Sequence, residues 1–231
     1  MLTLADIRRR ARSRLDDLNA PYLWSDVELN DCINDTLRDA ALRASLTVQD
    51  DIAIPFTQKA DLTWNNKYSL ASGILDVKSV YLASNTNFTL ARTSMRRREQ
   101  YLGGRVQYAG KPYAYAVDKT QAGTGDDEGI FVRALTFIGT PTAADTAYVD
   151  VVRLPVLLEA DGDIPEIDEI WHPDLVFGVT GLAFLKRDAD TFDPKKSERD
   201  MAVFEERFGP RLPAVVIRER QAEVPYEMIV M

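Results

Sequence analysis

The chain has 231 residues, which suffices for one large domain or two small ones. Hydrophobic residues make up 45% of it and charged residues 28%, values near the globular average that argue against a disordered or fibrous protein. The net charge of −8 argues against a general nucleic-acid coat, although a local basic patch is still compatible with it, and no apolar run approaches the ~18 residues of a transmembrane helix.

Two amphipathic helices are predicted at the N-terminal end. The first starts after Thr3, which can cap it, and its apolar face is expected to carry Leu4, Ile7, Ala11, Leu15 and Leu18. The second starts at a capping box formed by Ser25 and Glu28 and extends to about Leu46. Because a short turn containing Pro21 joins the two segments, we expect a helical hairpin.

From residue 50 to about residue 158 the pattern changes to β-strands, with many β-branched and aromatic residues. The predicted strands are Ile52–Phe56, Lys67–Leu70, Val77–Ala83, Tyr113–Val117, Ile130–Leu135 and Ala147–Leu154. Residues 121–129 are rich in glycine and predict a hairpin tip, and residues 94–102 predict a short basic helix. This block is expected to be a small antiparallel β domain.

The chain then returns to helices after an acidic connector. Residues 159–169 hold six acids and no base, which predicts a solvated segment. A helix over residues 173–188 is expected to bury one face, made of Leu175, Val176, Val179, Leu182, Ala183 and Leu185. Gly178 and Gly181 lower its helix propensity, so we expect close packing against another helix. A last helix over residues 194–208 ends at a Gly-Pro pair.

The final stretch, residues 210–231, has no helical period and is expected to be an extended tail. Its end is apolar without a core of its own, so we expect it to bind a neighbouring subunit through strand-forming side chains: Val224, Tyr226, Ile229 and Val230. The predicted fold is α+β. Residues 1–49 and 170–209 form a helical bundle, residues 50–169 an inserted antiparallel β domain, and residues 210–231 the tail.

The sequence offers one set of residues for catalysis. Asp161, Asp163 and His172 could supply acid–base groups to a small hydrolase, although a connector and a structural histidine explain them more simply. No phosphate-binding loop or nucleophile elbow is present, and Cys32 lies on an apolar helix stripe where a buried, inert thiol is expected. One cysteine and one histidine cannot form a disulfide or a zinc cage, so neither a metal nor a cofactor is expected.

Two basic clusters suggest a different alternative, a DNA-binding regulator. One is the run from Arg8 to Arg14. The other consists of Arg92, Arg96, Arg97, Arg98 and Arg105, with tyrosines nearby. Arginines beside aromatic rings can bind phosphates and stack on bases. Because the chain is acidic, we favour ion pairs with a neighbouring subunit over binding of nucleic acid.

Several phrases, taken in order, resemble one family. They are Trp24-Ser-Asp-Val-Glu-Leu-Asn-Asp, Ile74-Leu-Asp-Val-Lys-Ser-Val-Tyr-Leu, Gly110-Lys-Pro-Tyr-Ala-Tyr-Ala, Asp161-Gly-Asp-Ile-Pro-Glu, His172-Pro-Asp-Leu-Val and Ala183-Phe-Leu-Lys-Arg-Asp-Ala-Asp-Thr-Phe-Asp-Pro. Together they cover residues 20–210 and resemble head-to-tail adaptor (connector) proteins of tailed bacteriophages. The long β insertion is similar to that of the larger adaptors of short-tailed phages.

The resemblance implies a structural virion protein without catalytic residues. Such adaptors form a ring, typically of twelve subunits, under the portal, where they join the capsid to the tail and extend the DNA channel for genome retention and ejection. In such a ring the arginine cluster from Arg92 to Arg105 could face the lumen or a neighbouring subunit, and the apolar tail could bind the portal. The implied partners are other copies of the chain, the portal protein, a tail tube or nozzle protein, and double-stranded DNA that passes without sequence-specific binding. The implied location is the head–tail junction of the virion after synthesis in the host cytoplasm, with no membrane and no cofactor involved.

Overall fold

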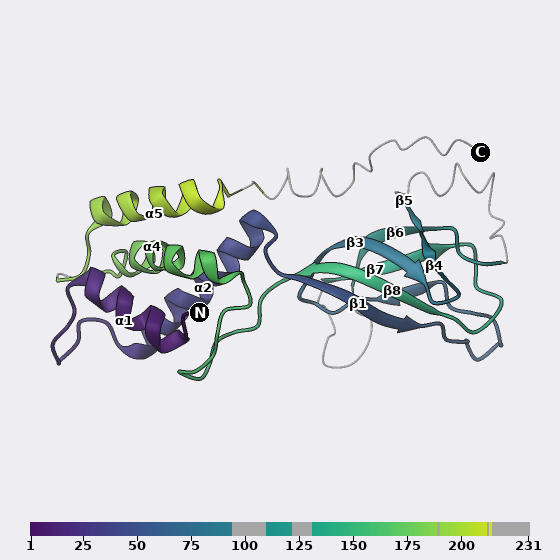
Figure 1. Ribbon diagram of the computed structural model, residues 1–231, viewed down its shortest axis with the longest axis horizontal. Helices are drawn as coiled ribbons and strands as arrows, with labels where there is room; N and C mark the ends of the chain where they lie inside the picture. Colours follow the sequence, from purple (N-terminus) through teal and green to yellow (C-terminus); the bar gives the residue numbers. More distant parts are fainter. Residues whose placement is uncertain (94–109, 122–130, 189, 212, 214–231) are drawn as a thin grey trace. The chain divides into compact units, whose positions relative to one another are not determined.

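The computed structural model describes residues 1–93, 110–121, 131–188, 190–211 and 213, which form two compact units (Figure 1). The helical unit comprises Met1–Thr47 and residues 154–211, and the β unit comprises Val48–Arg153. The fold is therefore α+β, as the sequence predicts, with helices from both ends of the chain in one unit and the strands in the other.

The helical unit contains α1 (Leu4–Leu15), α2 (Asp26–Ala44), the 3-10 turn η1 (Glu169–Trp171), α4 (His172–Ala183) and α5 (Pro194–Phe208). Both predicted N-terminal caps are confirmed, because Thr3 pairs with Asp6, and Ser25 with Glu28, in reciprocal capping boxes. The first helix ends earlier than its apolar spacing predicts. Asp16 adopts a left-handed conformation, so Leu18 lies outside α1 and is 59% exposed.

Helix α4 lies at the centre of the helical unit, in contact with α1, α2 and α5. The predicted reason for its glycines is confirmed. A Cβ atom on Gly178 would lie 2.4 Å from Cγ2 of Thr36 on α2 and 2.9 Å from Phe204 on α5, and one on Gly181 would lie 2.7 Å from Met201. Hydrogen at these two positions lets the three helices approach closely.

The buried face of α4 differs from the prediction at two leucines. Leu175 and Val179 are fully buried, whereas Leu182 is only partly buried and Leu185 is 48% exposed. Leu185 lies beyond Ala183, where α4 ends and the chain turns toward α5, whereas Leu182 lies in the last turn of the helix. The helical spacing of this stretch therefore continues in sequence beyond the end of the helix.

Two four-stranded sheets form the β unit. One sheet has the strand order β1-β8-β3-β4, made of β1 (Val48–Pro55), β8 (Thr146–Arg153), β3 (Ile74–Leu82) and β4 (Asn85–Thr89). The other has the order β2-β7-β6-β5, made of β2 (Lys67–Ser69), β7 (Phe131–Ile138), β6 (Ala114–Gln121) and β5 (Ala91–Thr93). Val77, Val149, Tyr115 and Phe137 come from both sheets and share one buried cluster, so the sheets pack face to face.

The strand predictions are largely confirmed, with two strands missed. β4 is exposed along its whole length and β5 has three residues, so neither shows a buried alternation. One pair departs from the expected antiparallel pattern, because β5 runs parallel to β6. Strands β6 and β7 pair antiparallel up to Gln121 and Phe131, the ends of the predicted hairpin, while the tip and the predicted helix over residues 94–102 lie outside the described residues.

The acidic connector belongs with the helices rather than with the β block to which the sequence boundaries assign it. Leu158 and Ile167 are buried in the same cluster as the helix side chains, which draws the segment onto the helical unit. Among the described residues, no helix has both the length and the apolar character needed to cross a bilayer.

Candidate functional site

The three residues considered for catalysis lie together, around the start of α1. The backbone amides of Leu4 and Ala5 donate to the carbonyl oxygens of Asp163 and Asp161, at 2.8 and 3.2 Å. Amides in the first turn of a helix have no partner within the helix. The connector therefore caps α1 with its backbone, in addition to the Thr3 side chain.

His172 is the first residue of α4 and is 1% exposed. Its Nδ1 accepts a hydrogen bond from the amide of Leu2 at 3.1 Å, and its Nε2 lies 2.9 Å from the carbonyl oxygen of Ile167. A carbonyl can only accept, so this arrangement corresponds to the tautomer with its proton on Nε2. Both ring nitrogens thus bind backbone groups, and the imidazole joins the N-terminus, the connector and α4.

The two carboxylates have structural partners as well. One oxygen of Asp163 accepts the amides of Glu159 and Ala160, both at 2.8 Å, and the Ala160 bond makes the largest contribution to the lowered pKa of this carboxyl group. The Asp161 carboxylate accepts a hydrogen bond from Nη2 of Arg8 at 2.7 Å. These contacts favour a structural role for all three residues.

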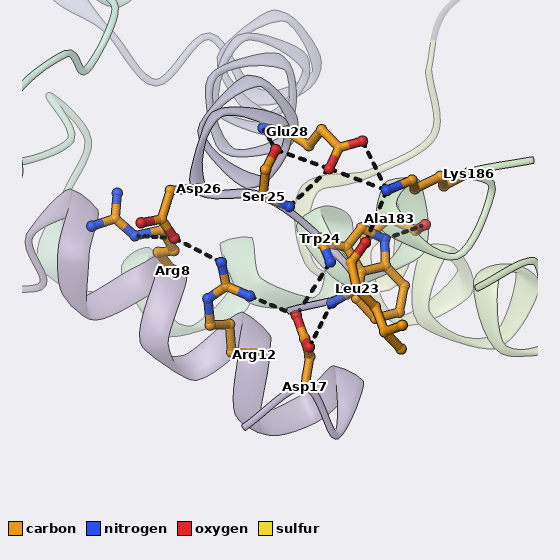
Figure 2. Close-up of polar contacts among 10 residues, drawn as sticks. All are labelled: Arg8, Arg12, Asp17, Leu23, Trp24, Ser25, Asp26, Glu28, Ala183 and Lys186. Atoms are coloured by element: carbon orange, nitrogen blue, oxygen red, sulfur yellow. Dashed lines mark hydrogen bonds and ion pairs between the residues drawn. The ribbon is translucent and has the colours of Figure 1, made fainter. Parts of the chain in front are cut away.

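The first basic cluster forms ion pairs within its own subunit, which corrects the expected pairing with a neighbouring subunit. Figure 2 shows Arg8 and Arg12 converging on the Asp26 carboxylate, at 3.4 and 2.7 Å, with Arg12 also 2.5 Å from Asp17. The guanidinium of Arg12 further stacks over the ring of Tyr22, 3.9 Å from its centroid. Two carboxylates and one aromatic ring therefore hold a single arginine.

The same network fixes the loop between α1 and α2 (Figure 2). Asp17 accepts the amides of Leu23 and Trp24, and the Trp24 indole donates to the carbonyl of Ala183 at 3.0 Å. Lys186 binds Glu28 at 2.9 Å, and this contact is the largest cause of a Glu28 pKa lowered to about 2. The end of α4 is thereby joined to the beginning of α2.

One buried carboxylate was missed at the sequence level. Asp200 on α5 is fully buried and accepts hydrogen bonds from Arg14 at 2.9 Å and from the Thr180 hydroxyl at 2.7 Å. Burial opposes its ionisation, but these donors lower its pKa overall. Its helical spacing could have indicated this burial. Asp200 lies three residues after Ser197 and four residues before Phe204, which are both on the buried face of α5.

The second basic cluster is described only at Arg92. Its guanidinium lies 2.9 Å from the Asp76 carboxylate and also donates to the carbonyl of Val77, so β5 of one sheet is joined to β3 of the other. Arg96, Arg97, Arg98 and Arg105 lie outside the described residues, as do the tail residues Val224, Tyr226, Ile229 and Val230.

The remaining candidate groups are the single cysteine and the possible metal ligands. Cys32 is half-buried, and burial raises the pKa of its thiol to about 11, which leaves it protonated near neutral pH. Within the described ranges, no group of three or more His, Cys, Asp or Glu side chains is placed to hold a metal ion.

In the helical unit, the polar side chains described above join chain segments to one another. A family model described as SU10 adaptor protein matches residues 2–227, nearly the whole chain, and the chain belongs to this family. It is thus a structural head-to-tail adaptor of a bacteriophage, located at the head–tail junction of the virion. No curated protein is significantly similar to the chain.

Proposed function

We propose that this adaptor assembles as a ring, with twelve subunits expected, that sits under the portal, joins the capsid to the tail tube or nozzle of a short-tailed phage, and extends the DNA channel. The observation that carries the proposal is the family match over residues 2–227, supported by the α+β fold. Its partners are then the portal protein, tail proteins and neighbouring copies.

The charge distribution supports a conduit that does not hold DNA tightly. Residues 1–47 and 154–211 contain 14 basic and 22 acidic side chains, a net charge of −8 that equals that of the whole chain. Three arginines of α1 that could have bound phosphates, Arg8, Arg12 and Arg14, already pair with Asp161, Asp26 and Asp200. Like charges repel the phosphates, so DNA could pass without tight binding.

The mass of the purified protein, alone and mixed with the portal protein, tests this proposal. A closed ring on the portal predicts a complex that contains a fixed number of adaptor copies, equal to the portal's own copy number or to a simple fraction of it. A chain that stays monomeric in both samples would overturn the proposal.

Residues 211–231 are proposed to bind the portal or a neighbouring adaptor in extended form. Strand addition would satisfy the backbone, and the apolar side chains of Val224, Tyr226, Ile229 and Val230 would fill pockets. Deletion of 211–231 should leave thermal unfolding of the monomer nearly unchanged and abolish capture by immobilised portal. Normal capture, or collapse of the truncated monomer, would contradict this assignment.

A further inference from the structure

The outer face of the β1-β8-β3-β4 sheet carries a small polar and aromatic patch. Strand register places Tyr81 directly opposite Tyr148 and Ser79 opposite Asp150, while Asp51 lies in a bulge of β1 beside them. Alternate residues of β3 and β8 point to opposite faces, and their other faces fill the core. We call these residues, Asp51, Ser79, Tyr81, Tyr148 and Asp150, the Tyr–Asp patch.

Hydrogen bonds hold the patch in place. The Tyr81 hydroxyl donates to Asp51, the Ser79 hydroxyl donates to Asp150, and the Asp51 amide donates to Asp150 at 3.0 Å. The two tyrosine rings stack with centroids 5.4 Å apart and planes at 27°. The bond to Asp51 is the largest cause of a Tyr81 pKa raised to about 12, so its hydroxyl remains a donor to that carboxylate.

The patch holds two carboxylates and no cation. Among the described residues, neither Asp51 nor Asp150 forms an ion pair, and their hydrogen bonds come from neutral groups. Asp51 is exposed, Asp150 and the two tyrosines are partly exposed, and Asp50 beside them is exposed as well. Two negative charges thus lie close together beside partly exposed aromatic rings.

In the helical unit, two carboxylates beside a tyrosine ring bind a guanidinium group. There, the guanidinium of Arg12 is bound by two carboxylates, Asp17 and Asp26, and stacks on the ring of Tyr22. The Tyr–Asp patch repeats those components, two carboxylates and tyrosine rings, without an arginine. Planar guanidinium groups suit both carboxylate oxygens and aromatic faces better than an ammonium does.

We propose that the Tyr–Asp patch binds the arginine segment Arg96-Arg97-Arg98 of a second copy of this chain. The other run of three arginines, Arg8 to Arg10, has two of its members in ion pairs within the helical unit. The arginine segment follows β5 in the chain. Each subunit would therefore offer its arginine segment to one neighbour and its Tyr–Asp patch to another. Such a heterologous contact closes a ring when its rotation allows.

This inference rests on the proposed ring and names the contact between its subunits. It is tested with two variants, D51N/D150N on the acidic side and R96Q/R97Q/R98Q on the basic side. Asparagine at position 51 keeps a carbonyl oxygen for the Tyr81 hydroxyl. At position 150 its carbonyl oxygen can accept the residue-51 amide and its amide group can donate to the Ser79 hydroxyl oxygen, so the sheet should keep its stability. D31N/D35N, which removes two exposed charges from α2 of the helical unit, is the matched control.

Sedimentation velocity, with and without portal protein, gives the readout. Each of the two patch variants should self-associate at least about tenfold more weakly than the wild type, and the control should assemble normally. A mixture of the two variants should recover one functional contact, between an intact patch and an intact arginine segment, and give a heterodimer that cannot close.

Three outcomes would overturn the inference. D51N/D150N could assemble like the wild type. The mixture could contain no heterodimer, which would place the arginines on the patch of their own chain. If the wild-type chain forms no assembly with or without portal, both the proposed ring and the proposed contact are wrong. If the wild type assembles normally and D51N/D150N does too, only the proposed contact is wrong.

Discussion

The helical unit and the β unit differ in how their charged side chains are paired. In the helical unit, Arg8, Arg12 and Arg14 reach across the fold to carboxylates on the connector, α2 and α5. In the β unit, Arg92 with Asp76 is a comparable internal pair, but Asp51 and Asp150 lie on an outer sheet face and form no ion pair with any residue that the structure describes. Charges satisfied inside a unit stabilise its fold, whereas uncompensated charges on its surface are available to a partner.

The hydrophobic core of the helical unit should give the largest effect. Leu37→Ala should lower the free energy of unfolding by about 2–5 kcal/mol, because the side chain is 1% exposed and its removal leaves a cavity. Leu182→Ala is the matched control and should cost much less, since Leu182 is only partly buried. Hydrogen exchange would locate the loss, which should appear in α1, α2, α4 and α5 and not in the sheets.

Removing the buried carboxylate should come next. Asp200→Ala should cost about 3 kcal/mol, because it leaves the Arg14 guanidinium without its carboxylate partner and removes the acceptor of the shortest Thr180 hydrogen bond. The lowered pKa of Asp200 implies stability that is present above its ordinary value of 3.8 and lost as the pH falls through the lower folded value. Chemical unfolding at several pH values checks both effects, with Glu198→Ala on the exposed face of α5 as the control. Equal losses in the two variants would contradict the role of Asp200.

The capping contact of α2 should matter less. Glu28→Gln should cost about 1 kcal/mol, because it weakens the capping box with Ser25 and removes the ion pair with Lys186. The Glu28 pKa is lowered from 4.5 to about 2, so the wild type should lose this contribution between those two pH values and the variant should not. If the stability of the wild type and that of Glu28→Gln fall in parallel as the pH is lowered, this expectation is wrong.

The smallest effect on folding is expected in the Tyr–Asp patch. Asp150→Asn should change the free energy of unfolding by less than about 0.5 kcal/mol. The asparagine carbonyl oxygen can accept the Asp51 amide, its amide group can donate to the Ser79 hydroxyl oxygen, and one repulsive charge is lost. Thermal unfolding of this variant beside Asp200→Ala contrasts the two units directly. A loss as large as that of Asp200→Ala would show that Asp150 serves the fold instead of a partner.

The elements with strong local signals were predictable, and those that depend on tertiary contacts were not. Both capping boxes and the close approach at Gly178 follow from residue types at fixed spacing. β4 and β5 lack that information, because one is exposed throughout and the other is too short to alternate.

The site residues show the same division. The sequence marked Asp161, Asp163 and His172 as neighbours, and the structure brings them together, but their partners are backbone groups that no spacing could indicate. The partners of the α1 arginines lie up to 186 residues away along the chain. Charge composition alone cannot distinguish such internal pairs from a binding surface.

Cross-linking of intact virions, followed by mass spectrometry, tests the assignment as a ring-forming adaptor most directly. The adaptor role predicts cross-links from this chain to the portal protein, to a tail protein and to neighbouring copies of itself, all in the same particles. Virions in which the chain cross-links to neither the portal nor a tail protein would contradict it.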